Sequence, residues 1–148
     1  MTQSSAIHAL AYTSRAVGGL TNADLERILV DASITNRAHD VTGALLYDGF
    51  RFLQYIEGPE AGLQAVLARI EAARSHAGIE MLVNGPVPER HFWNWSMACR
   101  HAQASMIQRL ERARWTERAH PHLLDQGEVN EGLALLSAFW QQDPPPPR

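Results

Sequence analysis

The sequence predicts an α+β fold with a ferredoxin-like β-α-β-β-α-β core, a fifth strand and two additional C-terminal helices. In the first hundred residues, two helical patterns alternate with short apolar runs. Asp48-Gly49 lies between two of these runs, which is a strong signal for a β-hairpin. This order of elements is typical of one sheet with both core helices packed on one face.

The first half of the core is expected to contain a strand, a helix and a hairpin. Residues 7–12 are apolar and lead into polar residues and glycines, which predicts the first strand. Thr21 precedes Asp24 by three positions, as in a capping box, and predicts a helix start. The helix should end near Asn36, after an apolar stripe at helical spacing: Leu25, Ile28, Leu29 and Ala32. Residues 41–47 and 51–58 predict the two strands of the hairpin.

The second half of the core is expected to contain a helix and two strands. Pro59 is expected at the first helical position, where its missing N–H costs least, and the helix should end near Arg74. Its buried stripe would be Leu63, Val66, Leu67 and Ile70. Residues 79–83 and 92–99 predict two more strands, and the glycine and prolines at 85–88 are expected to separate them.

The chain is expected to divide into a core domain at residues 5–100, a helical extension at 101–142 and a disordered proline-rich tail at 143–148. Apolar residues at helical spacing predict one helix around 106–110 and another around 129–140. Two helices are too few to fold alone. They should therefore dock on the exposed sheet face or on a second copy, and a homodimer or higher homo-oligomer is expected.

Charge and cysteine content exclude several classes of function. The 148 residues carry a net charge of −3 with scattered basic residues, so no nucleic-acid-binding surface is expected. The single cysteine, Cys99, excludes an internal disulfide and a multi-cysteine zinc site. The sequence contains neither a signal peptide nor a run of about 20 apolar residues, so a cytoplasmic protein without a membrane partner is expected.

A few polar side chains in apolar surroundings are the candidates for chemistry. Phosphate-loop, serine-hydrolase and zinc-protease motifs are absent from the sequence. His120 and His122 lack a third ligand in register, so no metal site is expected. Tyr12 ends the first strand, Asn36 closes the first helix and Gln54 interrupts an apolar strand. Because an unpaired buried amide costs about 1–3 kcal/mol, Gln54 should meet a polar protein group or a bound ligand.

Several motifs at a fixed mutual spacing resemble the BLUF domains, which are blue-light sensors that use FAD. The matching segments are YTSRA from Tyr12, Asn36, VTGALLY from Val41, FLQYIEG from Phe52 and WSM from Trp95. The likeness covers about residues 7–100 and needs no insertion or deletion between the polar positions. The resemblance implies a non-covalently bound FAD, with FMN or riboflavin as alternatives, between the two core helices.

The resemblance also implies roles for single residues. Tyr12 would donate an electron and a proton to the light-excited flavin, and Gln54 would lie between Tyr12 and the flavin N5/O4 edge. Asn36 would hydrogen-bond the ring near its C4 carbonyl, and Arg69 would face its O2 side. The remaining positions implied in cofactor binding are Ile28, His76 and Met97.

The signal is expected to leave through the last strand. Trp95 and Met97 resemble the pair whose packing changes after illumination, although such residues on a strand more often serve packing alone. The length of 148 residues is expected to hold the sensor and two helices without an effector domain. We therefore expect a photoreceptor that is not itself an enzyme and that signals to a separate protein partner.

The sequence departs from the family pattern in two places. The sequence reads ARSH at residues 73–76, where the family often has Asp-x-Arg-His, and Ala32 replaces a common Ser.

A ferredoxin-like small-molecule enzyme of the monooxygenase type is one alternative function, and a non-photoactive interaction module is the other. Only the light sensor would purify as a yellow protein with a reversible red shift.

Overall fold

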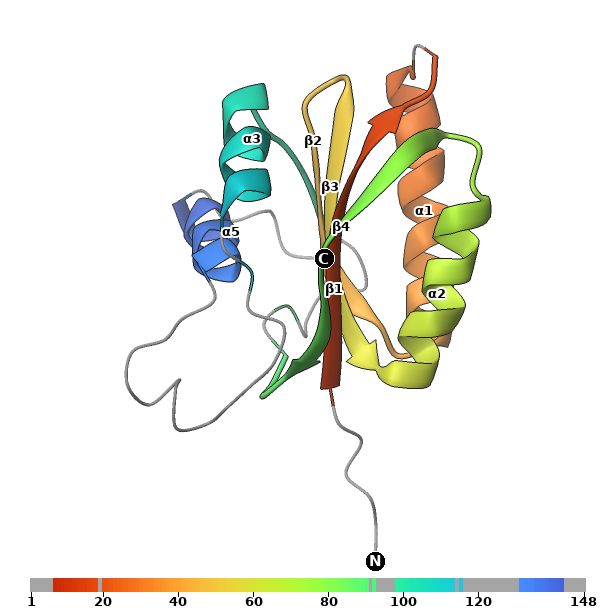
Figure 1. Cartoon of the computed structure of the whole chain (residues 1–148). Coiled ribbons are helices and arrows are strands. Elements are labelled where there is room, and N and C mark those ends of the chain that lie inside the picture. The colour runs from red at the N-terminus through yellow and green to blue at the C-terminus, as the bar shows by residue number, and fades with distance from the viewer. Residues whose placement is uncertain are drawn as a thin grey trace, which may run out of the picture.

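The computed structural model contains one five-stranded sheet between two helical layers (Figure 1). The structure describes residues 7–18, 20–90, 92, 98–113, 115 and 131–142. The elements in chain order are β1 (Ile7–Ala16), α1 (Asn22–Ala38), β2 (Thr42–Tyr47), β3 (Arg51–Pro59), α2 (Glu60–Ala72), β4 (His76–Val87), β5 (Ala98–His101), α3 (Ala104–Arg112) and α5 (Glu131–Gln142). The predicted ferredoxin-like core with a fifth strand and C-terminal helices is confirmed.

The sheet has the strand order β4-β1-β3-β2-β5. β1 pairs antiparallel with both β3 and β4, and β2 and β3 form the predicted antiparallel hairpin. Gly49 turns the hairpin with a φ of 102°, a value that favours glycine. β5 joins the sheet parallel to β2. The strands β1, β3 and β2 therefore have neighbours on both sides.

The start of α1 follows the predicted capping box. The Thr21 hydroxyl accepts the Asp24 N–H at 3.1 Å, and the Asp24 carboxylate accepts the Thr21 N–H at 3.0 Å. The Thr21 N–H, and after it the Thr21 hydroxyl, stabilise the carboxylate and lower the pKa of Asp24 below its ordinary value. The helix extends past Asn36 to Ala38, two residues beyond the predicted end.

The start of α2 differs slightly from the prediction. Pro59 is the N-cap with an extended ψ of 146°, and the first helical residue is Glu60. Pro59 is also the last residue of β3, so the strand leads directly into the helix. The helix ends at Ala72, which is two residues before the predicted end at Arg74.

The bounds of the last two strands were predicted less well. β4 continues through Gly85 and Pro86, which were expected to separate two strands. β4 lies at the edge of the sheet that the described residues form, so one side of its backbone pairs with no described strand and a proline is tolerated there. β5 begins at Ala98, where it pairs with Ala44 of β2, rather than at residue 92. Residues 93–97 of the predicted strand lie outside the described residues.

The sheet buries a different set of side chains on each face. α1 and α2 cover one face, and α3 and α5 cover the other (Figure 1). Ile107 and Leu110 of α3 and Leu133 and Leu136 of α5 pack with sheet residues such as Leu46, Leu53 and Tyr55. The C-terminal helices therefore dock on this chain's own sheet, which was one of the two predicted alternatives.

An ion pair adds to the packing of α3 on the sheet. Arg51 at the start of β3 contacts Glu111 of α3 through both terminal guanidinium nitrogens, with Nη1 2.9 Å from Oε1. Among the described residues, no helix is both long enough and apolar enough to cross a membrane. The predicted tail at 143–148 lies outside the described residues.

Candidate functional site

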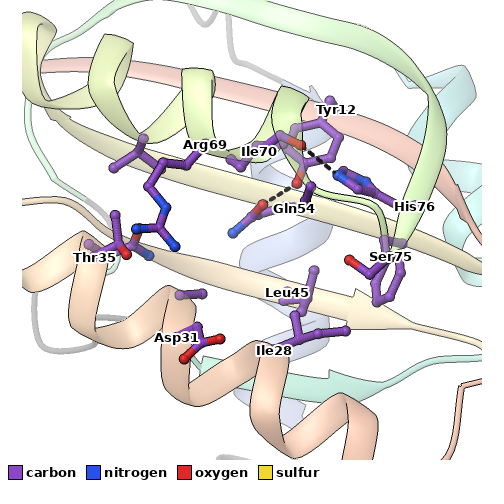
Figure 2. Close-up of a pocket in the computed structure, with 15 residues that line it drawn as sticks. Tyr12, Ile28, Asp31, Thr35, Leu45, Gln54, Arg69, Ile70, Ser75 and His76 are labelled. Carbon is purple, nitrogen blue, oxygen red and sulfur yellow. Dashed lines mark hydrogen bonds between the residues drawn. The ribbon is translucent and has the colours of Figure 1, made fainter.

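A cavity of about 210 Å³ opens between α1 and α2 over the sheet (Figure 2). Tyr12 of β1, Leu45 of β2 and Gln54 of β3 form part of its floor. Ile28 and Asn36 line it from α1. β1, the two core helices and both strands of the hairpin therefore contribute to one cavity.

Tyr12 and Gln54 are joined by a buried hydrogen bond in the cavity floor. The two residues lie directly opposite each other in the β1–β3 ladder, so their side chains emerge on the same face. The Tyr12 hydroxyl donates to Gln54 Oε1, as the dashed line in Figure 2 marks. Tyr12 is 3% exposed and Gln54 is 5% exposed. The polar protein partner that the sequence analysis requires for Gln54 is therefore present.

Burial reinforces the neutral form of Tyr12. Removal of the phenol from water disfavours the charged phenolate and raises the pKa of Tyr12 above its ordinary value. Tyr12 is therefore neutral at physiological pH and keeps its proton for the bond to Gln54.

Asn36 and Arg69 reach the cavity from opposite helices. Asn36 lies in the last turns of α1 and is 1% exposed, while its backbone carbonyl accepts the Val41 N–H at 2.8 Å. This bond ties the end of α1 to the start of β2. Arg69 of α2 is exposed, and its guanidinium extends across the cavity toward Thr35 (Figure 2). The cavity is thus lined by the buried amide of Asn36 and by the cation of Arg69.

His76 closes the cavity near the ends of α2 and β1. Its Nε2 lies 2.9 Å from the Ile70 carbonyl oxygen, and its Nδ1 lies 2.7 Å from the Ser14 hydroxyl. The His76 ring also lies 6.0 Å from the Tyr12 ring, measured between centroids. His76 therefore connects α2 to β1 beside the Tyr12–Gln54 pair.

The cavity brings together six of the predicted site residues. These are Tyr12, Ile28, Asn36, Gln54, Arg69 and His76. Trp95 and Met97 lie outside the described residues, as do His120 and His122. Within the described part of the chain, no group of three or more His, Cys, Asp or Glu side chains is arranged to hold a metal.

Several lining residues were not predicted from the sequence. Asp31 and Thr35 line the cavity from α1, one helical turn apart, and their helical spacing from Ile28 could have indicated this. The positions that depart from the family pattern, Ala32, Ala73 and Ser75, also line it. The departures therefore change the surface that meets a ligand.

The cavity residues fit the isoalloxazine ring of a flavin. Apolar walls come from both helices and the sheet, including Ile28, Val66 and Ile70. Hydrogen-bonding groups of Gln54 and Asn36 lie at the same cavity, and amides offer both donors and acceptors. A flat aromatic ring with carbonyl oxygens and nitrogens along one edge needs this combination.

Comparison with protein families and curated sequences gives consistent matches. The BLUF family model, described as sensors of blue-light using FAD, matches residues 7–98, which is more than half of the chain. Photoactivated adenylate cyclase subunit beta of Euglena gracilis is 37% identical over 70 residues, 47% of this chain and 8% of that protein. Subunit alpha of the same organism is 30% identical over 81 residues, 55% of this chain and 8% of that protein. The matched region therefore spans less than a tenth of these relatives.

Solved structures share the fold over more of the chain. The dark-state structure of BlrB, a BLUF protein, has a TM-score of 0.69 and 26% identity, covering 91% of this chain and 98% of that one. BlrP1 of Klebsiella pneumoniae with FMN and cyclic diGMP has a TM-score of 0.60 and 26% identity, covering 64% of this chain and 26% of that one. From the family match and these structural neighbours we conclude that the chain belongs to the BLUF family, the sensors of blue light using FAD.

Proposed function

We propose that this chain is a blue-light photoreceptor in which Tyr12 and Gln54 convert light absorbed by the bound flavin into a new hydrogen-bond pattern. The observation that carries the proposal is the buried hydrogen bond from Tyr12 to Gln54 in the cavity floor. FAD is the chromophore of the family to which the chain belongs. A redox-active phenol and a reorientable amide are thus in contact at one cavity.

The residues that would hold the flavin are those that line the cavity. Asn36 and Gln54 would hydrogen-bond the polar edge of the ring, and Arg69 would provide a positive charge near it. Ile28 would pack against the ring from α1, and His76 would close the cavity beside Tyr12. Met97 remains a cofactor-binding candidate from the family resemblance.

The chemistry of the two polar side chains explains their proposed roles. A bound flavin would supply the absorption of blue light and, once excited, the capacity to accept an electron. The neutral Tyr12 phenol loses one electron and releases its hydroxyl proton toward Gln54 Oε1, to which it is already hydrogen-bonded. The Gln54 amide has an acceptor at one end and a donor at the other, so rotation or tautomerisation reverses its hydrogen-bond pattern. With its electron and proton restored, Tyr12 would again be a neutral phenol, and the changed amide of Gln54 would retain the signal.

We further propose that the signal passes through β5 and the C-terminal helices to a separate protein. The support is that α3 and α5 pack on the sheet face opposite the cavity, against Leu53 and Tyr55 of the strand that carries Gln54. Trp95 and Met97 are the proposed signalling pair at the entrance to β5. Signalling as a homodimer or higher homo-oligomer and the division into a sensor domain and a helical extension belong to the same proposal.

Absorption spectroscopy tests this function. The purified protein should be yellow, and blue light should produce a red shift that reverses in darkness. Tyr12→Phe removes the hydroxyl and Gln54→Leu removes the amide, so each should abolish the normal shift. Tyr47→Phe is a matched control, because the Tyr47 hydroxyl donates to the Gly49 carbonyl at the hairpin instead.

The two alternative functions predict different results. An interaction module should purify without colour. A small-molecule enzyme of the monooxygenase type would not show a reversible light response that depends on Tyr12 and Gln54. A colourless protein, or a normal light response in both variants, would contradict the proposed function.

A further inference from the structure

Glu57 is a carboxylate buried on the sheet face opposite the flavin cavity. Side chains alternate along β3, so Gln54 faces the cavity while Tyr55 and Glu57 face the C-terminal helices. Glu57 is 0% exposed. A buried carboxylate is costly unless hydrogen-bond donors surround it, so its partners carry information about its role.

Both oxygens of Glu57 accept hydrogen bonds. Tyr55 donates its hydroxyl to Oε1 at 3.0 Å, and the backbone N–H of Phe92 donates to Oε2 at 2.5 Å. Burial and the nearby Glu57 carboxylate raise the pKa of Tyr55, which keeps its hydroxyl a donor. The Phe92 side chain is also buried, and its ring packs edge-on against Tyr55 at 5.6 Å. Glu57 and Tyr55 together hold the backbone and the ring of Phe92.

Arg90, two residues before Phe92, makes further hydrogen bonds that hold this part of the chain. Its guanidinium donates to the carbonyl oxygens of Asp40 and Glu57, at 2.8 and 3.3 Å, and to the Thr42 hydroxyl at 2.9 Å. The ion pair with the Asp40 carboxylate at 3.1 Å contributes less, because that carboxylate is 77% exposed. Arg90 therefore fixes the start of this stretch to β2, β3 and the turn after α1.

The position of Phe92 in the sequence gives these contacts a functional meaning. Phe92 precedes Trp95 and Met97 by a few residues, and β5 follows at Ala98. Glu57 accepts two hydrogen bonds from this part of the chain: its carboxylate accepts the Phe92 N–H, and its backbone carbonyl oxygen accepts from the Arg90 guanidinium. Gln54 lies three residues earlier on the same strand. A displacement of β3 at Gln54 would therefore move the point that holds Phe92.

We propose that Glu57 is a positioning residue for light signalling, which holds Phe92, a few residues before Trp95 and Met97 in the sequence, in its dark position through the Phe92 backbone N–H. This inference rests on the proposed light-sensing function. Tyr12 and Gln54 produce the change on the cavity face, and Glu57 transmits it to the opposite face. The carboxylate stabilises the dark arrangement more than the lit arrangement, so its loss prolongs the lit state.

The experiment compares Glu57→Gln with the wild type as the flavin-loaded full-length chain. The variant has nearly the same shape but lacks the charge, and an amide cannot accept at both ends. Two readouts are needed: the rate of dark recovery from absorption, and the ¹H–¹⁵N signal of Phe92 in darkness and under blue light. Glu80→Gln on β4 is the control, because Glu80 is exposed.

We expect Glu57→Gln to keep the red shift of the flavin and to recover about three- to tenfold more slowly, since hydrogen bonds to a charged group are among the stronger ones. The dark-state Phe92 amide proton should move upfield in the variant, and its change under light should shrink. Glu80→Gln should behave as the wild type does. Recovery within twofold of wild type together with an unchanged Phe92 signal would overturn the proposal.

Tyr55→Phe provides a second test if Glu57→Gln does not fold. It removes the donor to Oε1 but keeps the ring and the bond to Phe92, so recovery should slow by a smaller factor. An unchanged recovery rate and Phe92 signal in Tyr55→Phe would also count against the proposal. The wild-type red shift is measured separately: its absence contradicts the proposed function, while the dark-state Phe92 signal still tests the contact with Glu57.

Discussion

His76 is a single residue whose two ring nitrogens tie together the elements around the cavity. The Ile70 carbonyl oxygen 2.9 Å from Nε2 can only accept a hydrogen bond, so Nε2 carries the proton in the uncharged ring. Nδ1 then accepts from the Ser14 hydroxyl at 2.7 Å. We expect ¹⁵N NMR of the uncharged His76 ring to show a protonated Nε2 and an unprotonated Nδ1. The opposite tautomer would contradict this assignment.

Ser14→Ala tests the same contact through stability. The variant removes the donor to Nδ1 in a buried position, so the free energy of unfolding should fall by about 1 kcal/mol. Ser105→Ala, exposed on α3, is the matched control and should change it by less than about 0.5 kcal/mol. Equal effects of the two variants would show that the His76 contact contributes little.

The burial of a polar residue inside an apolar run could be predicted from the sequence, whereas the burial of a polar residue at the end of such a run could not. Gln54 stands inside the apolar run of β3, so its burial and its need for a partner were predictable. Glu57 lies next to Gly58-Pro59, where an exposed charge is expected, yet it is fully buried. Its partner Phe92 is 35 residues away in the sequence, and only the folded chain brings the two together.

At the scale of elements, Gly62 sets how closely α2 approaches the end of α1. A Cβ atom at Gly62 would lie 2.2 Å from the His39 carbonyl oxygen, which is too close for any real contact. Alanine favours a helix by about 1 kcal/mol over glycine, but overpacking costs about 1–3 kcal/mol. We therefore expect Gly62→Ala to lower the free energy of unfolding in urea and to weaken flavin retention, because the two cavity helices are forced apart.

A neighbouring position provides the control for Gly62→Ala. Ala61 is exposed on α2, so Ala61→Gly should cost no more than about 1 kcal/mol through helix propensity and leave flavin retention unchanged. A Gly62→Ala variant that is as stable as the wild type and keeps its flavin would contradict the close helix contact.

Local patterns predicted the type of each core element better than its ends. The capping box at Thr21 and the hairpin at Asp48-Gly49 form as predicted, because local hydrogen bonds and backbone preferences determine them. The passage of β4 through Pro86 depends on its place at the edge of the sheet, which no local pattern contains. Strand order is a property of the folded chain, so element bounds that depend on it could not be predicted.

At the scale of the whole molecule, the sheet separates a cavity face from a face covered by the C-terminal helices (Figure 1). β3 lies inside the sheet and presents Gln54 to the first face and Tyr55 to the second. The Arg51–Glu111 ion pair fastens α3 to the start of this same strand. A change in β3 can therefore reach the C-terminal helices without a separate connecting element.

The stability of the whole molecule should fall at alkaline pH because folding buries groups in their neutral form. Burial raises the pKa of Cys99 to about 11 and raises the pKa values of Tyr12 and Tyr55 above the ordinary tyrosine value. The stability that this provides is fully present below the unfolded pKa values, which are about 8.5 for Cys and about 10 for Tyr. Above them the unfolded chain releases protons that the native chain keeps, so the free energy of unfolding decreases.

Urea unfolding from about pH 8 to about pH 11, at one flavin concentration, measures this loss. Each group should contribute up to about 1.4 kcal/mol per pH unit between its unfolded and folded pKa values. Cys99→Ala should remove the part of the loss that begins near pH 8.5, and Tyr12→Phe should remove a part that begins only near pH 10. Identical pH dependence in the wild type and Cys99→Ala would contradict a buried, neutral thiol. In that case the native thiol would have an ordinary pKa and would ionise over the same pH range as the unfolded thiol, so it would contribute no pH dependence to the free energy of unfolding.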